Sequence, residues 1–208
     1  IDNYIIPLHM RPEYIQGNAY DIRHKSRLGA NEDELIDSIM RHSPSPRDAI
    51  EWIDYLKSTK SIENVPSMCV SLTRAIRQND QHFLGKFGEQ IVNEGCLDEQ
   101  SEYFFGILRE ALASADYPTL LELRRLGLSM ISQPTMEFIE HTGVFMVIQN
   151  QNVDALQFIL DGVYLTGDTF CALFEGIAEM SNREMMDVLL NPDNDAVPID
   201  AASYASDD

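Results

Sequence analysis

The feature that most limits the fold of this chain is a short pattern that returns along much of its length. At each return, a Ser, Asp or Asn residue is followed by apolar residues four and seven positions later. Such a polar side chain caps the free N–H groups in the first turn of a helix, and the apolar spacing makes one stripe along that helix. The intervals between the starts are 35, 36, 36 and 30 residues. The five candidate caps are Ser45, Asp80, Asp116, Asn152 and Asn182.

A second amphipathic run precedes each of these helices, so the repeating unit is a pair of helices. The runs cover residues 35–40, 68–76, 103–112, 138–148 and 170–180. One helix pair cannot bury its apolar faces alone, whereas a stack of pairs buries a continuous core. The sequence therefore predicts an all-α fold, a right-handed stack of about five helical hairpins. A small or aliphatic residue precedes each of the last four caps by five positions, where the two helices would cross closely: Ala75, Ala111, Val147 and Ile177.

The units resemble degenerate ankyrin repeats. The likeness lies in the segments ALASADYPTLLELRRLGL, VIQNQNVDALQFILDGV and IAEMSNREMMDVLL, each with a small residue, a short polar turn and a helix ending in leucines. No unit carries the Thr-Pro-Leu-His opening of that family, and the period is slightly longer. The resemblance implies an ankyrin-like α-solenoid that binds proteins without catalysis. A HEAT-like or irregular array of helical hairpins is the alternative.

The pattern also sets the expected boundaries. Residues 31–190 form the repeat domain, residues 1–30 form an N-terminal cap or a linker, and residues 191–208 form an acidic, flexible tail.

Three of the capped helices run into a glycine, which tolerates the left-handed conformation that ends a helix. Ser43 and Ser45 each precede a proline, and we interpret them as turn and cap residues, with proline-directed phosphorylation as the alternative. The three glycine stops are Gly95, Gly127 and Gly162.

Charge and hydropathy exclude two classes of partner. The formal net charge is −19, whereas nucleic-acid binding needs a basic face that displaces counterions. No run of about 18 apolar residues is present, so we expect no membrane span. After Gly127 the only Lys or Arg residue is Arg183. This acidic third of the chain is either a solvated face or a docking surface for a partner with a basic surface.

Catalytic, metal and cofactor signatures are missing from the sequence. There is no glycine-rich phosphate loop, no Gly-x-Ser-x-Gly and no His-Glu-x-x-His. Three widely spaced cysteines argue against a disulfide framework and for the reducing cytoplasm, or the host cytoplasm if the chain is a pathogen effector. We expect no catalytic residue, no metal site and no cofactor. A cysteine nucleophile with a histidine base is the alternative, and its candidates are Cys69, Cys96, Cys171, His82 and His141.

The predicted function is that of a non-catalytic protein–protein interaction module. Helical arrays present an extended concave surface made by the first helices and the turn tips. Partner contacts should therefore come from positions on those helices that lie off the apolar stripe. One alternative is an acidic mimic that occupies a basic, nucleic-acid-binding surface of its partner, and another is the regulatory or catalytic domain of an unfamiliar enzyme. The predicted partner-binding residues are Arg74, Arg77, Gln78, Arg109, Gln149, Asn150 and Glu179.

Overall fold

The computed structural model describes residues 35, 36, 39, 43–58, 62, 66–163 and 165–191. Every regular element within this described part is a helix, which confirms the all-α prediction there. No helix in it is both long enough and apolar enough to cross a membrane. The predicted cap or linker at residues 1–30 lies outside the described residues, as does the predicted tail after residue 191.

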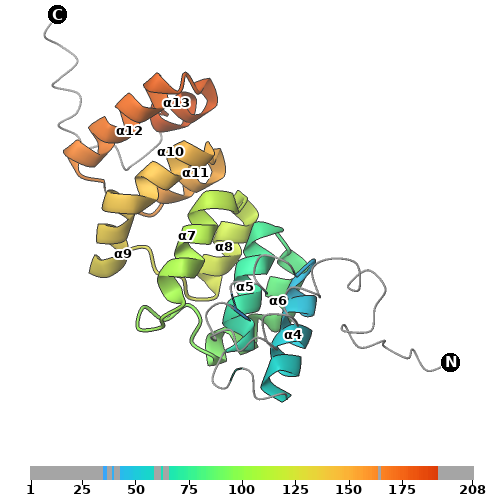
Figure 1. The fold of residues 1–208 in the computed structure, drawn as a ribbon. Helices are drawn as coiled ribbons and strands as arrows, with labels where there is room; N and C mark the ends of the chain where they lie inside the picture. The colour runs from blue at the N-terminus through green and yellow to red at the C-terminus, as the bar shows by residue number, and fades with distance from the viewer. Residues whose placement is uncertain are drawn as a thin grey trace, which may run out of the picture.

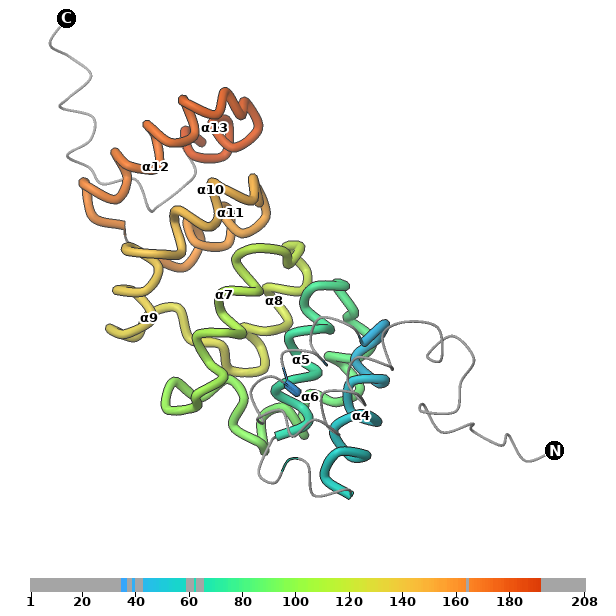
Figure 2. The backbone as a smooth tube through the Cα atoms, viewed as in Figure 1, coloured from blue at the N-terminus to red at the C-terminus, as the bar shows by residue number. Residues whose placement is uncertain are grey.

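The helices follow one another as consecutive pairs (Figure 1). The first members of the pairs pack on each other in the order α5, α7, α10 and α12, and the second members pack in the order α6, α8, α11 and α13. The backbone trace shows the pairs forming one elongated array (Figure 2). The pairs are α5 (Ser67–Arg77) with α6 (Gln81–Asn93), α7 (Phe104–Ser114) with α8 (Tyr117–Arg125), α10 (Val144–Asn150) with α11 (Val153–Leu160), and α12 (Gly167–Glu179) with α13 (Arg183–Leu189).

Two further helical stretches complete the described elements. The helix α4 (Pro46–Ser58) precedes the first of these pairs. The helix α9 (Gln133–Phe138) leads into a π-helical turn, η2 (Ile139–Gly143), which continues directly into α10. The amphipathic run expected at residues 138–148 is therefore helical throughout, with a local widening of the helix just before α10.

All five predicted caps are confirmed. The Ser45 Oγ atom accepts a hydrogen bond from the backbone N–H of Asp48 at 3.2 Å, at the start of α4. Each such bond satisfies a donor that the helix itself leaves free, so the sequence signal and the helix starts share one physical cause. The other four side chains accept from the N–H three residues later, with donors at Phe83, Thr119, Ala155 and Met185.

Three of the turns between paired helices are closed by the same backbone geometry. The residue before the cap has a left-handed backbone, with φ of 51° at Asn79, 51° at Gln151 and 54° at Ser181. The N–H of the following cap residue then reaches back to the carbonyl five residues earlier, which closes the first helix. These carbonyls belong to residues that were predicted at the helix crossings, and all are fully buried: Ala75, Val147 and Ile177.

Side chains at these turns also tie each pair to the pair before it. Asn152 Nδ2 donates to the carbonyl oxygens of Leu112 at 3.2 Å and Ala115 at 3.1 Å. In the neighbouring turn, Asn79 Oδ1 accepts from the N–H of Asp116 at 2.8 Å. We call these bonds between successive turns the turn ladder. Because each rung bonds a side chain to backbone groups of a neighbouring turn, the ladder fixes the spacing between pairs.

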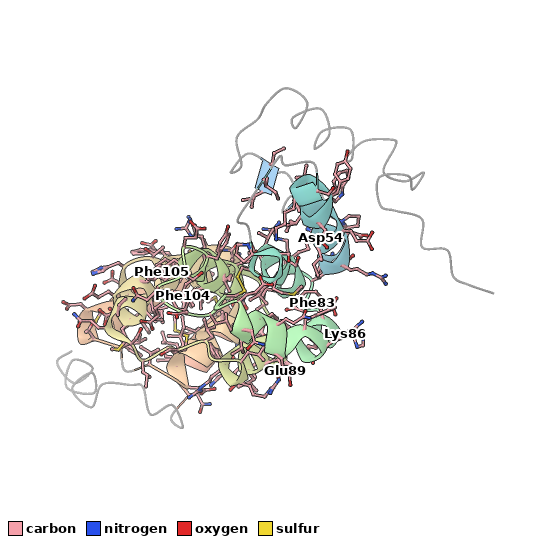
Figure 3. The ribbon with its side chains drawn as sticks, turned by 90° about the horizontal axis from the view of Figure 1, so that it is seen from below. Asp54, Phe83, Lys86, Glu89, Phe104 and Phe105 are labelled. Atoms are coloured by element: carbon pink, nitrogen blue, oxygen red, sulfur yellow. A yellow bond between two sulfur atoms is a disulfide. The ribbon has the colours of Figure 1, made fainter. Side chains whose placement is uncertain are left out.

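The core divides into two clusters. The larger runs without interruption from Met68 to Leu189. The smaller surrounds Trp52 on α4 and reaches Val70 on α5. The helix α4 packs chiefly against α5, so the row of second helices begins at α6. In Figure 3, α4 with the labelled Asp54 lies to one side of α6, which carries the labelled Phe83 and Lys86.

The glycine stops are confirmed in part. Gly95 and Gly127 have φ of 66° and 116°, a conformation that favours glycine. Gly162 does not have this conformation; its N–H instead bonds to the carbonyl of Ile159 at 3.1 Å. The expectation for Gly162 is therefore wrong, because α11 ends in an ordinary turn rather than a left-handed one.

A disulfide joins Cys69 to Cys96, and the expectation that the cysteines stay unpaired is wrong. Cys69 lies in the first turn of α5, and Cys96 follows the end of α6. The two helices run antiparallel, so the open ends of the pair meet although 27 positions separate the cysteines. Both side chains are buried. Cys171 on α12, one of the candidate nucleophiles, is a free and exposed cysteine.

Candidate binding surface

One exposed surface runs across three successive first helices. Arg109 on α7, Phe145 on α10 and Glu175 on α12 each lie seven residues before the next cap, so they occupy equivalent positions. All three are exposed, and α10 packs against both of the other helices. We call this strip the first-helix surface. It also includes the exposed residues near the ends of α10 and α12, which are Gln149, Asn150 and Glu179.

Phe145 is the residue of this surface that the sequence analysis missed. Its side chain is 59% exposed, whereas its neighbours Val144 and Val147 on the same helix are buried. Its position in the repeat, seven residues before the cap, could have identified it as exposed. The equivalent positions hold a charged residue in the adjacent pairs, Arg109 and Glu175, which indicates that this position faces solvent in these three pairs, although the equivalent Thr73 on α5 is buried.

Four of the seven predicted partner-binding residues lie on the first-helix surface. Arg109 projects from the middle of α7, and Gln149 and Asn150 close α10. Asn150 Nδ2 donates to the carbonyl of Met146 at 2.8 Å, which holds the amide against its own helix. Glu179 is exposed at the end of α12. All four residues are therefore exposed on the first helices α7, α10 and α12, and α10 also carries Phe145.

The other three predicted residues already make contacts within the chain. Arg77 on α5 donates to both carboxylate oxygens of Glu110 on α7, at 2.8 Å and 2.6 Å. The hydrogen bond from Arg77 to Glu110 raises the pKa of Arg77 above its usual value. Gln78 Nε2 donates to the carbonyl of Pro44 at 2.5 Å. Arg74 is partly buried and also interacts within the chain. Arg77 therefore connects two neighbouring helices, and the contact of all three residues with a partner stays a prediction.

The charge on the first-helix surface changes sign along the array. Arg109 supplies a positive charge on α7, Phe145 lies between, and Glu175 and Glu179 supply negative charges on α12. An apolar centre with charges around it is the usual anatomy of a protein interface. Opposite charges at its two ends fix the direction in which a partner can lie.

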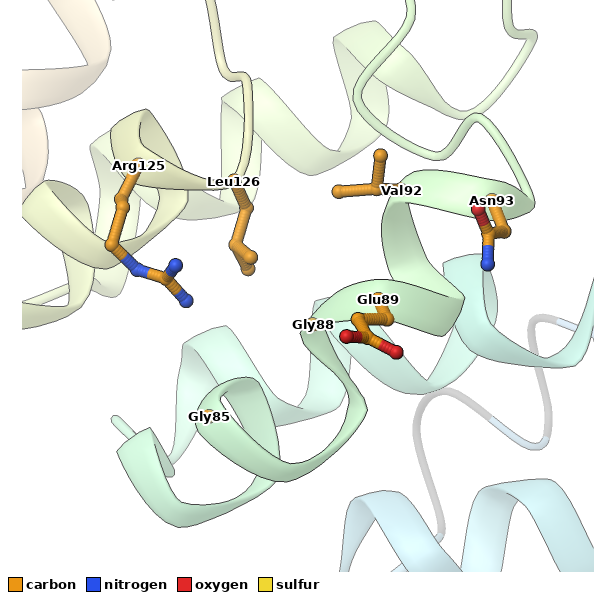
Figure 4. Close-up of a pocket in the computed structure, with 7 residues that line it drawn as sticks. All are labelled: Gly85, Gly88, Glu89, Val92, Asn93, Arg125 and Leu126. Atoms are coloured by element: carbon orange, nitrogen blue, oxygen red, sulfur yellow. The ribbon is translucent and has the colours of Figure 1, made fainter.

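A hollow lies on the second helices of the array (Figure 4). It has a volume of about 620 Å³ and lies between α6 and the end of α8. Arg125 is paired there with Glu122 at 2.6 Å, and this hydrogen-bonded pair lowers the pKa of Glu122 below its usual value. Val92 stands 51% exposed at the edge. The lining residues are Gly85, Gly88, Glu89, Val92, Asn93, Arg125 and Leu126.

The two glycines in this hollow have different roles, which a pair of substitutions can separate. A Cβ atom at Gly85 would meet nothing within 4 Å, whereas one at Gly88 would lie 2.8 Å from Leu126 Cδ2. We expect Gly85→Ala to stabilise the protein by about 0.5–1 kcal/mol through its greater helix propensity. Gly88→Ala should gain about 1 kcal/mol less, because Leu126 must move. Urea unfolding measures both, and an equal gain at the two positions would contradict this packing.

One group of possible metal ligands occurs among the described residues. The donor atoms of Cys69, Glu94 and Cys96 lie within 4.8 Å of one another. The two sulfur atoms are joined in the disulfide, so neither cysteine offers a thiolate to a metal or acts as a nucleophile in this form. Glu94 Oε2 instead accepts the N–H of Met68 at 3.1 Å, which caps a free donor at the start of α5.

No family model matches the chain, and no curated protein or solved structure matches it either. Any function assigned to this chain therefore rests on the arrangement of its own residues.

Proposed function

We propose that this chain is an ankyrin-like α-solenoid, a right-handed stack of helical hairpins that binds a partner protein through its first-helix surface and performs no catalysis. The observation that carries the proposal is Phe145, an aromatic side chain 59% exposed at the centre of that surface. The packing of the helices supports it as well, because α10 contacts both α7 and α12, the two helices whose equivalent positions also hold exposed side chains.

Covering the exposed Phe145 side chain contributes to the free energy of binding. Burying a large apolar side chain stabilises an assembly by about 1.5–3 kcal/mol. A few central anchors of this kind carry most of the free energy of binding at protein interfaces, and the polar rim keeps water out. Arg109, Gln149 and Glu175 surround Phe145 at equivalent or adjacent positions of the three helices and can act as that rim.

The acidic-mimic alternative needs its carboxylates on one face. Exposed carboxylates of the C-terminal third lie on the first helices at Glu175 and Glu179, and on the second helices at Asp154 and Asp187. Glu137 on α9 and Asp168 at the start of α12 are exposed as well, so the carboxylates extend along several helix pairs, which favours a solvated surface over a mimic that gathers them on one face. We therefore propose a protein partner, with a basic region where it approaches α12, and no nucleic acid or membrane.

The cysteines bear on the cellular compartment of the protein in two opposite ways. Three cysteines in the whole chain favour the cytoplasm. The Cys69–Cys96 disulfide argues for an oxidising compartment instead, because intracellular thiols keep most disulfides reduced.

A salt-resolved capture experiment tests the function. The purified chain is used as bait in a cell lysate, washed at low or high salt, and the retained proteins are identified by mass spectrometry. An apolar anchor predicts a partner that stays bound at high salt, since salt screens exposed charges and leaves apolar contacts intact. A partner lost at high salt would favour the acidic mimic. Finding no partner under either condition would contradict the proposal.

A further inference from the structure

The last helix pair exposes apolar positions that every earlier pair buries. Eight residues before the cap, Leu72, Leu108 and Val144 are all buried, whereas the equivalent Phe174 is 42% exposed. The position four residues before the cap shows the same contrast. There, Ile76, Leu112 and Ile148 are buried and Ala178 is exposed.

The second helix of the last pair shows the same change. Four residues after the cap, Leu84, Leu120 and Leu156 are fully buried, whereas Met186 is only partly buried. Leu190, directly after α13, is 55% exposed. We call Phe174, Ala178, Met186 and Leu190 the end face. Phe174 and Ala178 lie two positions before and after Gly176, which faces Ile148 on α10, so these two side chains point away from α10.

Earlier pairs show what covers these positions. A Cβ atom at Gly143, just before α10, would lie 2.9 Å from Leu112 Cδ1 on α7. A Cβ atom at Gly176 on α12 would lie 2.8 Å from Ile148 Cδ1 on α10. In both places a glycine of the next pair packs closely against the apolar residue four positions before the cap, Leu112 or Ile148. A helix lying alongside α12 is therefore the shape that fits the end face.

Carboxylates border the end face. Glu175 and Glu179 lie next to Phe174 and Ala178 on α12, and Glu184 and Asp187 lie on α13. All four are exposed. The one basic side chain on these two helices is Arg183, whose Nε atom lies 3.8 Å from Asp187 Oδ2. The border is thus strongly negative around an apolar centre.

We propose that the end face docks a basic amphipathic helix of a partner protein, at the place where one more first helix of the array would lie. Apolar side chains of that helix would cover Phe174 and Leu190, and its Lys and Arg residues would meet the bordering carboxylates. Charge argues against two other occupants. Residues 192–208 contain five aspartates and no Lys or Arg, and a second copy of the chain would bring the same acidic border.

Binding of two matched probes tests this proposal. The first probe is a short helical peptide of leucine and lysine, and the second replaces every lysine by glutamate. Isothermal titration of the full chain should show binding of the lysine peptide alone. Phe174→Glu and Leu190→Glu should each weaken that binding at least about tenfold, a typical loss for a central anchor. Leu121→Glu, which adds the same charge at an exposed apolar position on α8, outside both proposed surfaces, should change it less than about twofold.

Three results would overturn the proposal. They are no binding of the lysine peptide at up to about 1 mM, equal binding of the glutamate peptide, and an equal loss in Leu121→Glu. Because all three positions are exposed, circular dichroism should show the helical content of the chain unchanged in each variant.

A photo-crosslinker at position 174, introduced as Phe174→p-benzoylphenylalanine, identifies the occupant directly. Crosslinks to the lysine peptide support the proposal. Crosslinks to residues 192–208 of the same chain would assign the face to that segment, and crosslinks to a second copy would assign it to a dimer. Both outcomes would contradict a basic helix as occupant. Although Glu175 and Glu179 border both surfaces, Phe145 is not part of the end face, so neither outcome tests the Phe145 anchor, and this proposal and the proposed function succeed or fail separately.

Discussion

Removing the Cys69–Cys96 disulfide should lower the free energy of unfolding by about 3–4 kcal/mol, the value expected for a closed loop of this length. The double substitution Cys69→Ala and Cys96→Ala releases α5 from the end of α6, so the unfolded chain regains the conformations that the crosslink forbids. Because both sulfur atoms are buried, the smaller alanine side chains also lose packing contacts, which adds to the effect. Urea unfolding under oxidising conditions measures the difference.

Cys171→Ala is the matched control for the disulfide. Its thiol is free and exposed, so the substitution should change the stability by less than about 0.5 kcal/mol. Adding a thiol reductant to the wild-type chain should reproduce most of the loss seen in the double variant. An unfolding midpoint that is the same with and without reductant would show that the disulfide does not hold α5 and α6 together.

Asn152→Ala should cost about 3 kcal/mol of stability, the largest loss that we expect from any single cap residue. The side chain makes three hydrogen bonds: Oδ1 caps α11 through the N–H of Ala155, and Nδ2 donates to the carbonyls of Leu112 and Ala115. A lost cap costs about 1 kcal/mol, and each partly buried carbonyl left without its donor costs about as much again. Thermal or urea unfolding measures the loss.

Two comparisons separate the cap from the turn ladder. Asn182→Ala removes the same kind of cap, from Met185, but its Nδ2 bond goes only to exposed Gln151, so we expect a loss of about 1 kcal/mol. Asn152→Asp keeps the acceptor for the cap and removes both donors to the preceding pair, so its loss should fall between the two alanine variants. Equal losses in Asn152→Ala and Asn182→Ala would contradict a structural role for the ladder.

The helix pairs and their caps could be predicted from the sequence because their causes are local. A cap bonds to an N–H three residues away, and an apolar stripe depends on spacing within one helix. Ser45, Asp80 and Asn182 could therefore be identified without knowing what surrounds them. Trp52 lies on the predicted apolar stripe, seven positions after the cap Ser45, and it is fully buried.

Features that depend on contacts between pairs could not be predicted in this way. The Cys69–Cys96 disulfide forms because an antiparallel pair brings its open ends together, and the spacing of the cysteines alone does not show this. Arg77 was expected to face a partner, but Glu110 on the next pair holds it. Phe145 and Phe174 are both exposed aromatic residues on first helices. Comparing equivalent positions across the repeats shows that they face different surfaces, and no single repeat carries that information.

The affinity of the captured partner for two matched variants tests the central claim most directly, that the chain binds its partner through the first-helix surface. Phe145→Asp places a charge at the proposed anchor. Leu121→Asp places the same charge on α8, at a residue of the second-helix row that is 43% exposed. We predict that Phe145→Asp weakens binding at least about thirtyfold, the loss expected at a central anchor, and that Leu121→Asp changes the affinity less than about twofold. Unchanged affinity in Phe145→Asp, or a larger loss in Leu121→Asp, would contradict the claim.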